Sequence, residues 1–237
     1  YYRNHLVEIL LPIRENANES ILFFQGWEFT GFQGLASHGA AIAIILVMYF
    51  YSKNVVKRPI LWILDRIVIP VASGAIFVRL GNFFNSEIVG EATTSPFGIK
   101  FLHDAYSAQD AQQLTQIPDT KMAYDAIATN PQFSELLSQI PAKHPAQLYE
   151  AVGYIAIFAL LFFMYWKTDA RNKPGLLFGV FLVTLWTVRF IVEFIKESQG
   201  GFESALGLFS TGQWLSIPFI IAGLFFIFKA RKLPNSI

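Results

Sequence analysis

The chain has 237 residues, of which 54% are hydrophobic, and its formal net charge is +1 at pH 7. This near-neutral charge excludes a strongly basic nucleic-acid-binding protein. Cysteine is absent, which excludes disulfides, thiolate metal sites and a cysteine nucleophile. The first residue is Tyr1 and not methionine, so we expect a processed chain or a fragment with no signal peptide to identify.

The hydrophobic residues fall in blocks, and five of these are candidate membrane spans. A spanning helix needs about 20 mostly apolar residues. A soluble all-α protein has one or two such runs, whereas five indicate a polytopic membrane protein. We therefore predict an all-α membrane helix bundle with five spanning helices. In chain order the blocks are 34–52, 59–79, 147–166, 175–194 and 214–228.

The basic residues of the loops predict the orientation of these blocks. Three basic clusters lie after the first, third and fifth blocks and hold nine of the 18 basic residues. If the blocks alternate in direction, the clusters share one side, which the positive-inside rule makes cytoplasmic. The clusters are Lys53, Lys57 and Arg58; Lys167, Arg171 and Lys173; and Lys229, Arg231 and Lys232.

The long segment 85–146 falls on the opposite side and is more acidic than basic. Its stretches SAQDAQQLTQI and NPQFSELLSQI predict short amphipathic helices, interrupted by Pro118 and Pro131. We expect a small extracytoplasmic helical subdomain, inserted between spanning helices of a single membrane domain that covers residues 1–237.

The uncommon polar residues of the spans gather at one depth, the outer interface. Arg189 lies 14 residues into its block, about 21 Å along a helix, and Glu193 is one turn further. Charged residues in spans usually face the bundle interior or a wet cavity. Two arginines at one depth indicate a phosphate site, and the outer leaflet supplies phosphate as lipid headgroups. The other members are His38, Arg79, Asn82, Asn85, Glu87 and the segment HPAQLYE at 144–150.

Each of these charged residues also has a simpler interpretation. Arg79 is equally compatible with a side chain that snorkels to the interface. Arg189 and Glu193 are four residues apart and fit an i,i+4 ion pair. His38, next to a glycine, is typical of a structural histidine that only makes hydrogen bonds. The clustering of these groups, more than any one of them, favours a functional site.

The segment HPAQLYE also fits the start of a helix. Pro145 suits the first helical position and Gln147 the third. Glu150 would still need a partner inside the helix bundle. Asp65 and Arg66 lie nearer the cytoplasmic end of the second block, and we interpret them as structural.

Five segments, in order, resemble motifs of the bacterial prolipoprotein diacylglyceryl transferase family. RLGNFFNSEIVG at 79–90 resembles the family signature R-x-G-N-x-x-N-x-E-x-x-G. Ala40 stands where the family usually has a second glycine. The family is expected to have seven spanning helices, and the two not counted here would precede residue 1. The other matching segments are LASHGA at 35–40, HPAQLYE at 144–150, VRFIVEFIKE at 188–197 and GQWLSIP at 212–218.

The resemblance implies a reaction in the bacterial inner membrane. The sn-1,2-diacylglyceryl group of phosphatidylglycerol moves to the lipobox cysteine thiol of a prolipoprotein signal peptide, which yields a thioether and glycerol phosphate. This is the first step of lipoprotein maturation. The substrate supplies the thiol, so an enzyme without cysteine is no obstacle. No metal is expected, because His38, His144 and the acids show no ligand spacing. No cofactor and no nucleic-acid partner are expected either.

The resemblance also implies roles for individual residues. Arg79 and Arg189 hold and activate the phosphate, and His38 is a candidate base or orienting group. Asn82 and Glu87 contact the glycerol headgroup or order Arg79. The remaining expected site residues are Gly90, where the backbone approaches closely, and the supporting Gly39, Asn85, His144, Gln147, Tyr149, Glu150 and Glu193, the last of which orients Arg189.

The alternative is a transporter or phospholipid-binding membrane protein without chemistry. It would favour inverted repeats or helices broken near the midplane, and the sequence shows neither pattern. A purely structural membrane subunit would leave the arginine cluster without a purpose.

Overall fold

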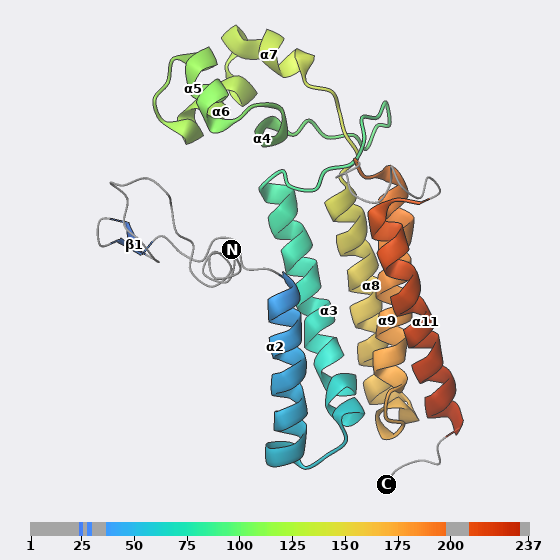
Figure 1. The fold of residues 1–237 in the computed structure, drawn as a ribbon. Helices are drawn as coiled ribbons and strands as arrows, with labels where there is room; N and C mark the ends of the chain where they lie inside the picture. Colours follow the sequence, from blue (N-terminus) through green and yellow to red (C-terminus); the bar gives the residue numbers. More distant parts are fainter. Residues whose placement is uncertain (1–23, 26–27, 30–36, 198–208, 233–237) are drawn as a thin grey trace. The chain divides into compact units, whose positions relative to one another are not determined.

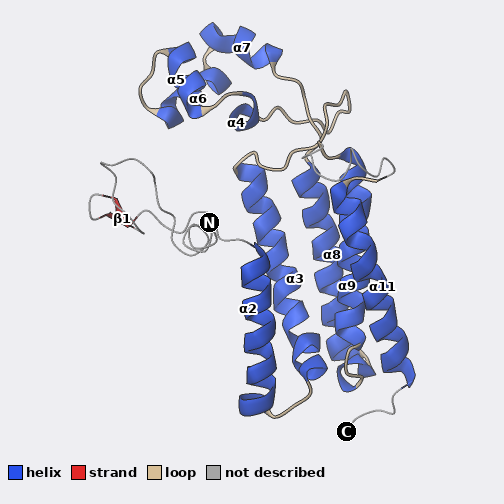
Figure 2. Ribbon diagram, in the orientation of Figure 1, coloured by secondary structure: helices blue, strands red, loops and turns tan. Residues whose placement is uncertain are grey.

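The computed structural model describes residues 24–25, 28–29, 37–197 and 209–232 (Figure 1). It divides into two compact units, Tyr1–Ile60 and Leu61–Ile237, which are described separately. Helices dominate the described residues, as predicted, and Figure 2 shows them in blue. The strands β1 (Phe24–Gln25) and β2 (Glu28–Phe29) form one short antiparallel pair.

The first unit contains helix α2 (Ser37–Phe50), which continues as the π-helix η1 (Tyr51–Val56). Lys57 ends it in the left-handed conformation, with φ of 54°, and Pro59 then prevents its continuation. Residues 34–36 of the first predicted block lie outside the described residues. The α-helical part has only 14 residues, so this block is not confirmed as a span.

The second unit contains four helices that are long and apolar enough to cross a membrane, the number found among the described residues. They agree with the last four predicted blocks, so a multi-pass helical membrane protein is confirmed and the count of five is not. These helices are α3 (Ile60–Phe84), α8 (Ala146–Lys167), α9 (Leu176–Val192), which continues as the 3-10 turn η4 (Glu193–Ile195), and α11 (Thr211–Lys232).

Close packing holds these four helices together. Lipid tails are as apolar as leucine, so membrane helices associate through tight contacts of small residues more than through the hydrophobic effect. A Cβ added to Gly179 on α9 would lie 2.8 Å from the carbonyl oxygen of Gly223 on α11, and the reverse substitution would clash equally. Buried side chains of α3, α8 and α9, such as Val68, Tyr154 and Phe181, fill the interior.

Asp65 links α3 to the start of α9. Its buried carboxylate accepts hydrogen bonds from the backbone N–H groups of Gly175 at 2.6 Å and Phe178 at 2.8 Å. Gly175 is the N-cap of α9 and Phe178 lies in its first turn, where backbone N–H groups have no acceptor within the helix itself. Arg66 donates to the carbonyl of Trp62 and lies 3.4 Å from the centre of its ring. Both contacts agree with the structural interpretation of Asp65 and Arg66.

A group of short helices lies between α3 and α8 in sequence. Its interior is formed by Ala111, Ala123 and Ile127. Ser107 and Asp110 form a capping box at the start of α5, and these hydrogen bonds from Ser107 hold the pKa of Asp110 below its usual value. Both predicted helices are present, and α6 lies between them. The elements are α4 (Leu102–Ala105), α5 (Ala108–Thr115), α6 (Thr120–Thr129), η2 (Pro131–Phe133) and α7 (Ser134–Gln139).

Candidate active site

Arg79 lies within α3 and not at its end. We expected the second block to stop at this charge, but α3 continues to Phe84 and includes Asn82. The expectation was wrong because Arg79 is neutralised inside the bundle and therefore does not mark the membrane boundary. Its side chain is only 10% exposed, which also argues against a snorkelling arginine.

The chain after α3 makes a strained turn that leads to Gly90. Ser86 and Ile88 both adopt left-handed conformations, with φ of 56° and 57°. This conformation is costly for a β-branched residue, and such strain is typical of functional segments. A Cβ on Gly90 would lie 2.6 Å from the carbonyl oxygen of Ile195 and 2.7 Å from that of His144. The expected close backbone approach at Gly90 is therefore confirmed.

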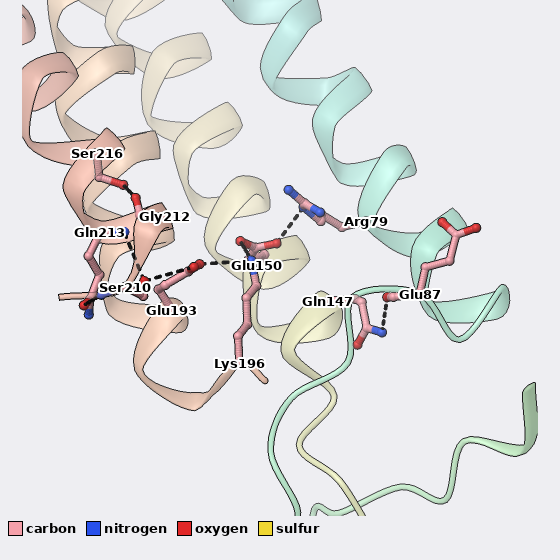
Figure 3. A network of polar contacts seen from close by, with 10 residues as sticks. All are labelled: Arg79, Glu87, Gln147, Glu150, Glu193, Lys196, Ser210, Gly212, Gln213 and Ser216. Atoms are coloured by element: carbon pink, nitrogen blue, oxygen red, sulfur yellow. Dashed lines mark hydrogen bonds and ion pairs between the residues drawn. The ribbon is translucent and has the colours of Figure 1, made fainter. Parts of the chain in front are cut away.

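Glu150, on the first turns of α8, is the centre of a buried ion-pair network (Figure 3). Its side chain is fully buried, and its Oε2 lies 2.6 Å from Nε of Arg79. Its Oε1 lies 2.9 Å from Nζ of Lys196, whose side chain is also buried. The sequence predicted that Glu150 would need a partner inside the helix bundle, and the structure gives it two, Arg79 and Lys196.

Gln147 lies one turn before Glu150 on the same buried face of α8. Its Nε2 donates to the carbonyl oxygen of Glu87 at 2.6 Å, which ties α8 to the turn after α3. Its buried Oε1 has no hydrogen-bond partner among the described residues. The carboxylate that holds Arg79 belongs to Glu150, and the side chain of Glu87 is exposed. Figure 3 shows the two carboxylates on opposite sides of Arg79.

Glu193 does not form the expected ion pair with Arg189 within the described part of the chain. Its Oε2 lies 3.6 Å from Nζ of Lys196, and its Oε1 accepts a hydrogen bond from Oγ of Ser210 at 3.1 Å. The α-helical spacing of the two residues is kept, because the N–H of Glu193 donates to the carbonyl of Arg189, but Lys196 and Ser210 hold the carboxylate instead. Gly212 makes room for this carboxylate, because a Cβ there would clash with it.

Arg189 is held by aromatic rings. Its Cζ lies 5.2 Å from the centre of the Trp186 ring, which stacks on Phe219 with 4.2 Å between centroids and 6° between planes. Its buried Nε has no hydrogen-bond partner in the described ranges. Tyr154, buried one turn beyond Glu150 on α8, interacts electrostatically with both Arg79 and Arg189. The structure therefore brings the two predicted arginines to one site.

The remaining predicted residues are described by their local structure. His38 and Gly39 lie in the first turn of α2 in the first unit, and the side chain of His38 lies outside the described part. Asn85 is exposed just after α3, where its N–H donates to the carbonyl of Gly81 at 2.9 Å. Nδ1 of His144 lies 3.3 Å from the hydroxyl of Tyr149.

Sequence reasoning missed four members of the network. Lys196, Ser210, Gly212 and Gln213 all lie in or beside the quoted motifs VRFIVEFIKE and GQWLSIP. The available signal was the spacing of Lys196, three residues after Glu193 on one side of a helical turn. It was overlooked because lysines near the ends of spans commonly reach the interface.

An all-helical bundle with several apolar helices, and a buried cluster of arginine, lysine and glutamate at one end of it, define a multi-pass membrane protein with a cationic site. The family model described as prolipoprotein diacylglyceryl transferase matches residues 2–229. The chain belongs to this bacterial family.

Curated relatives agree with this assignment. A phosphatidylglycerol–prolipoprotein diacylglyceryl transferase of Porphyromonas gingivalis is 40% identical over 216 residues, which are 89% of this chain and 66% of the relative. The protein of that name in Bacteroides fragilis is 34% identical over 232 residues, 98% of this chain and 69% of the relative. A third, from Tolumonas auensis, is 35% identical and matched over 63% of its length. The chain thus spans about two thirds of these relatives.

Proposed function

We propose that the protein transfers the sn-1,2-diacylglyceryl group of phosphatidylglycerol to the lipobox cysteine thiol of prolipoproteins. The names of its relatives support both substrates. The observation that carries the proposal is that the buried Arg79 and the half-buried Arg189 both interact electrostatically with Tyr154. A guanidinium group is the preferred protein ligand for a phosphate in a dry site.

The proposed reaction exchanges one bond for another. The cysteine sulfur forms a bond to the sn-3 carbon of the diacylglyceryl group while the bond from this carbon to the phosphate oxygen breaks. Negative charge grows on the departing glycerol phosphate, and Arg79 and Arg189 stabilise it. The thiol has an ordinary pKa of about 8.5, so removing its proton needs only modest help. By family resemblance, His38 is either the base that takes this proton or an orienting group.

The other predicted residues have binding and supporting roles in this proposal. The glycerol headgroup is bound at the end of α3 and in the turn that follows it, by Asn82, Glu87 and Gly90. From α8, Gln147 holds this turn through its hydrogen bond to Glu87, and Glu150 holds Arg79 through their ion pair. The further supporting residues are Gly39, Asn85, His144, Tyr149 and Glu193.

We also propose a topology for the whole chain. The first predicted block, residues 34–52, forms a fifth span, the three basic clusters face the cytoplasm, and the site faces the outer leaflet of the inner membrane. Segment 85–146 is then an extracytoplasmic subdomain of a single membrane domain covering residues 1–237. Phosphatidylglycerol and the lipobox peptide are the partners, and neither a cofactor nor nucleic acid takes part.

Arginine substitutions test the assigned chemistry. Arg79→Ala and Arg189→Ala in the full-length protein should each lower the rate of diacylglyceryl transfer by about 100-fold or more, because each removes a donor from the developing phosphate charge. The rate is measured with phosphatidylglycerol vesicles and a lipobox peptide, for protein that elutes as a single species in detergent.

Arg66→Ala is the matched control, because Arg66 lies on the same helix but contacts Trp62. It should keep the transfer rate of the folded wild-type protein within a few-fold. Full activity in Arg79→Ala or Arg189→Ala would contradict the phosphate role of that residue.

A further inference from the structure

Lys196 is a buried cation shared by two carboxylates. Lys196 is 8% exposed, and its Nζ lies 2.9 Å from Oε1 of Glu150 and 3.6 Å from Oε2 of Glu193. Its backbone pairs with Gly90 in an antiparallel bridge, so the turn after α3 fixes its position. A buried ammonium is costly unless carboxylates compensate it, and this arrangement supplies them.

The same carboxylates are thereby divided among several cations. Glu150 is shared between Arg79 and Lys196, and Lys196 also contacts Glu193, so among the described residues Arg79 pairs only with a shared carboxylate. Arg189 contacts the ring of Trp186 and has no carboxylate partner in the described part of the chain. Among the residues that the structure describes, the three cations Arg79, Lys196 and Arg189 therefore accompany two carboxylates, Glu150 and Glu193, which leaves this cluster a surplus of one positive charge.

We propose that Lys196 is a positioning residue that maintains this surplus for one monoanionic phosphodiester. A phosphodiester carries a single negative charge, so its arrival would neutralise the cluster. Lys196 also prevents Glu150 from neutralising Arg79 alone. This inference rests on the proposed function, because it takes the ligand to be the lipid phosphate, and it adds the residue that sets the charge of the site.

Removing the lysine should weaken lipid binding through charge. In Lys196→Met the cluster becomes neutral, and Glu150 is left to pair with Arg79. We expect the KM for phosphatidylglycerol to rise by about 10-fold or more, with a smaller fall in kcat, since charge interactions in a poorly solvated site are strong. Lys196→Arg should keep both constants within a few-fold, because it preserves the charge.

A purely structural role for Lys196 predicts a different pattern. In that case the lysine would only join α8 to η4, and removing Glu193 as well would lower the affinity for phosphatidylglycerol further. The double variant Lys196→Met/Glu193→Gln separates the two roles. It loses two members of the network but regains the surplus of one positive charge, because two cations, Arg79 and Arg189, remain with one carboxylate, Glu150. We expect its affinity for phosphatidylglycerol to recover to within about 3-fold of the wild type.

The experiment uses the full-length protein in phosphatidylcholine nanodiscs with a graded fraction of fluorescent phosphatidylglycerol. It measures lipid binding, the KM and kcat of transfer to a lipobox peptide, and the melting temperature. Lys121→Met is the control for a lysine that is exposed on α6, and it should leave both constants unchanged. If Lys196→Met gives no folded protein, Lys196→Gln, which is also uncharged, replaces it.

Two results would overturn the inference. One is a Lys196→Met variant with wild-type affinity, and the other is a double variant that binds no better than the single one. Failure of the proposed function is distinguishable, because a wild-type protein that binds phosphatidylglycerol but modifies no peptide contradicts only the enzyme. The binding measurement then still decides the role of Lys196.

Discussion

Arg79 and Arg189 both interact electrostatically with Tyr154, but contacts of different kinds hold them. Arg79 is fixed by the carboxylate of Glu150 at 2.6 Å. Arg189 rests on the face of Trp186, which is itself stacked on Phe219. A ring positions a guanidinium without neutralising it. Arg189 therefore offers a fuller positive charge to a phosphate than Arg79 does.

This difference makes Trp186 a second positioning residue with a measurable effect. Trp186→Leu removes the ring under Arg189, and a cation–π contact in a dry site contributes about 1–2 kcal/mol. We expect a 5- to 30-fold weaker affinity for phosphatidylglycerol in the nanodisc assay, with partial retention in Trp186→Phe.

Trp166→Leu is the control, because Trp166 is exposed near the other end of α8. It should bind phosphatidylglycerol as the wild-type protein does. Unchanged affinity in Trp186→Leu would show that Arg189 needs no aromatic support.

At the scale of helices, α9 is fixed by different devices at its two ends. Its first turn donates backbone hydrogen bonds to Asp65 of α3, and its last turn tightens into η4. Between them, Gly179 allows close contact with α11. Arg189 and Lys196 lie on or just after the second end, so their placement depends on the position of α9 as a whole.

Loss of the Asp65 cap should therefore lower stability more than chemistry. Asp65→Ala leaves two backbone donors of α9 without their acceptor, which costs about 1–3 kcal/mol. We expect a melting temperature several degrees lower in detergent, with an unchanged KM for phosphatidylglycerol in the protein that stays folded.

Asp125→Ala, on the exposed side of α6, should leave the melting temperature as it is in the wild-type protein. An Asp65→Ala variant as stable as the wild type would contradict the capping role of Asp65.

The spans could be predicted because each long apolar run forms a helix almost regardless of its neighbours. Helix α8 begins and ends within one residue of its predicted block. The end of α3 was misplaced, because a charge such as Arg79 marks a boundary only if nothing inside the bundle pairs with it. That partner, Glu150, lies on another helix, and sequence spacing alone does not identify it.

The same limit applies to the candidate site at the scale of the whole molecule. Its two predicted arginines both interact electrostatically with Tyr154, but its network draws on α3, α8, η4 and α11. The partner of Glu193 was mispredicted because its carboxylate contacts Lys196 and Ser210, and Ser210 is 17 residues away in the sequence. Lys196 was missed because its role depends on Glu150 and Glu193, two carboxylates that only the fold brings together.

The central claim is that this membrane protein moves a diacylglyceryl group from phosphatidylglycerol to a cysteine thiol. The most direct test incubates the purified full-length protein with phosphatidylglycerol vesicles and a lipobox peptide, and then measures peptide mass and free glycerol phosphate. We predict a peptide heavier by one diacylglyceryl group and an equal amount of glycerol phosphate. An unmodified peptide and no glycerol phosphate, from protein that still binds phosphatidylglycerol, would contradict the claim and favour a non-catalytic lipid-binding protein.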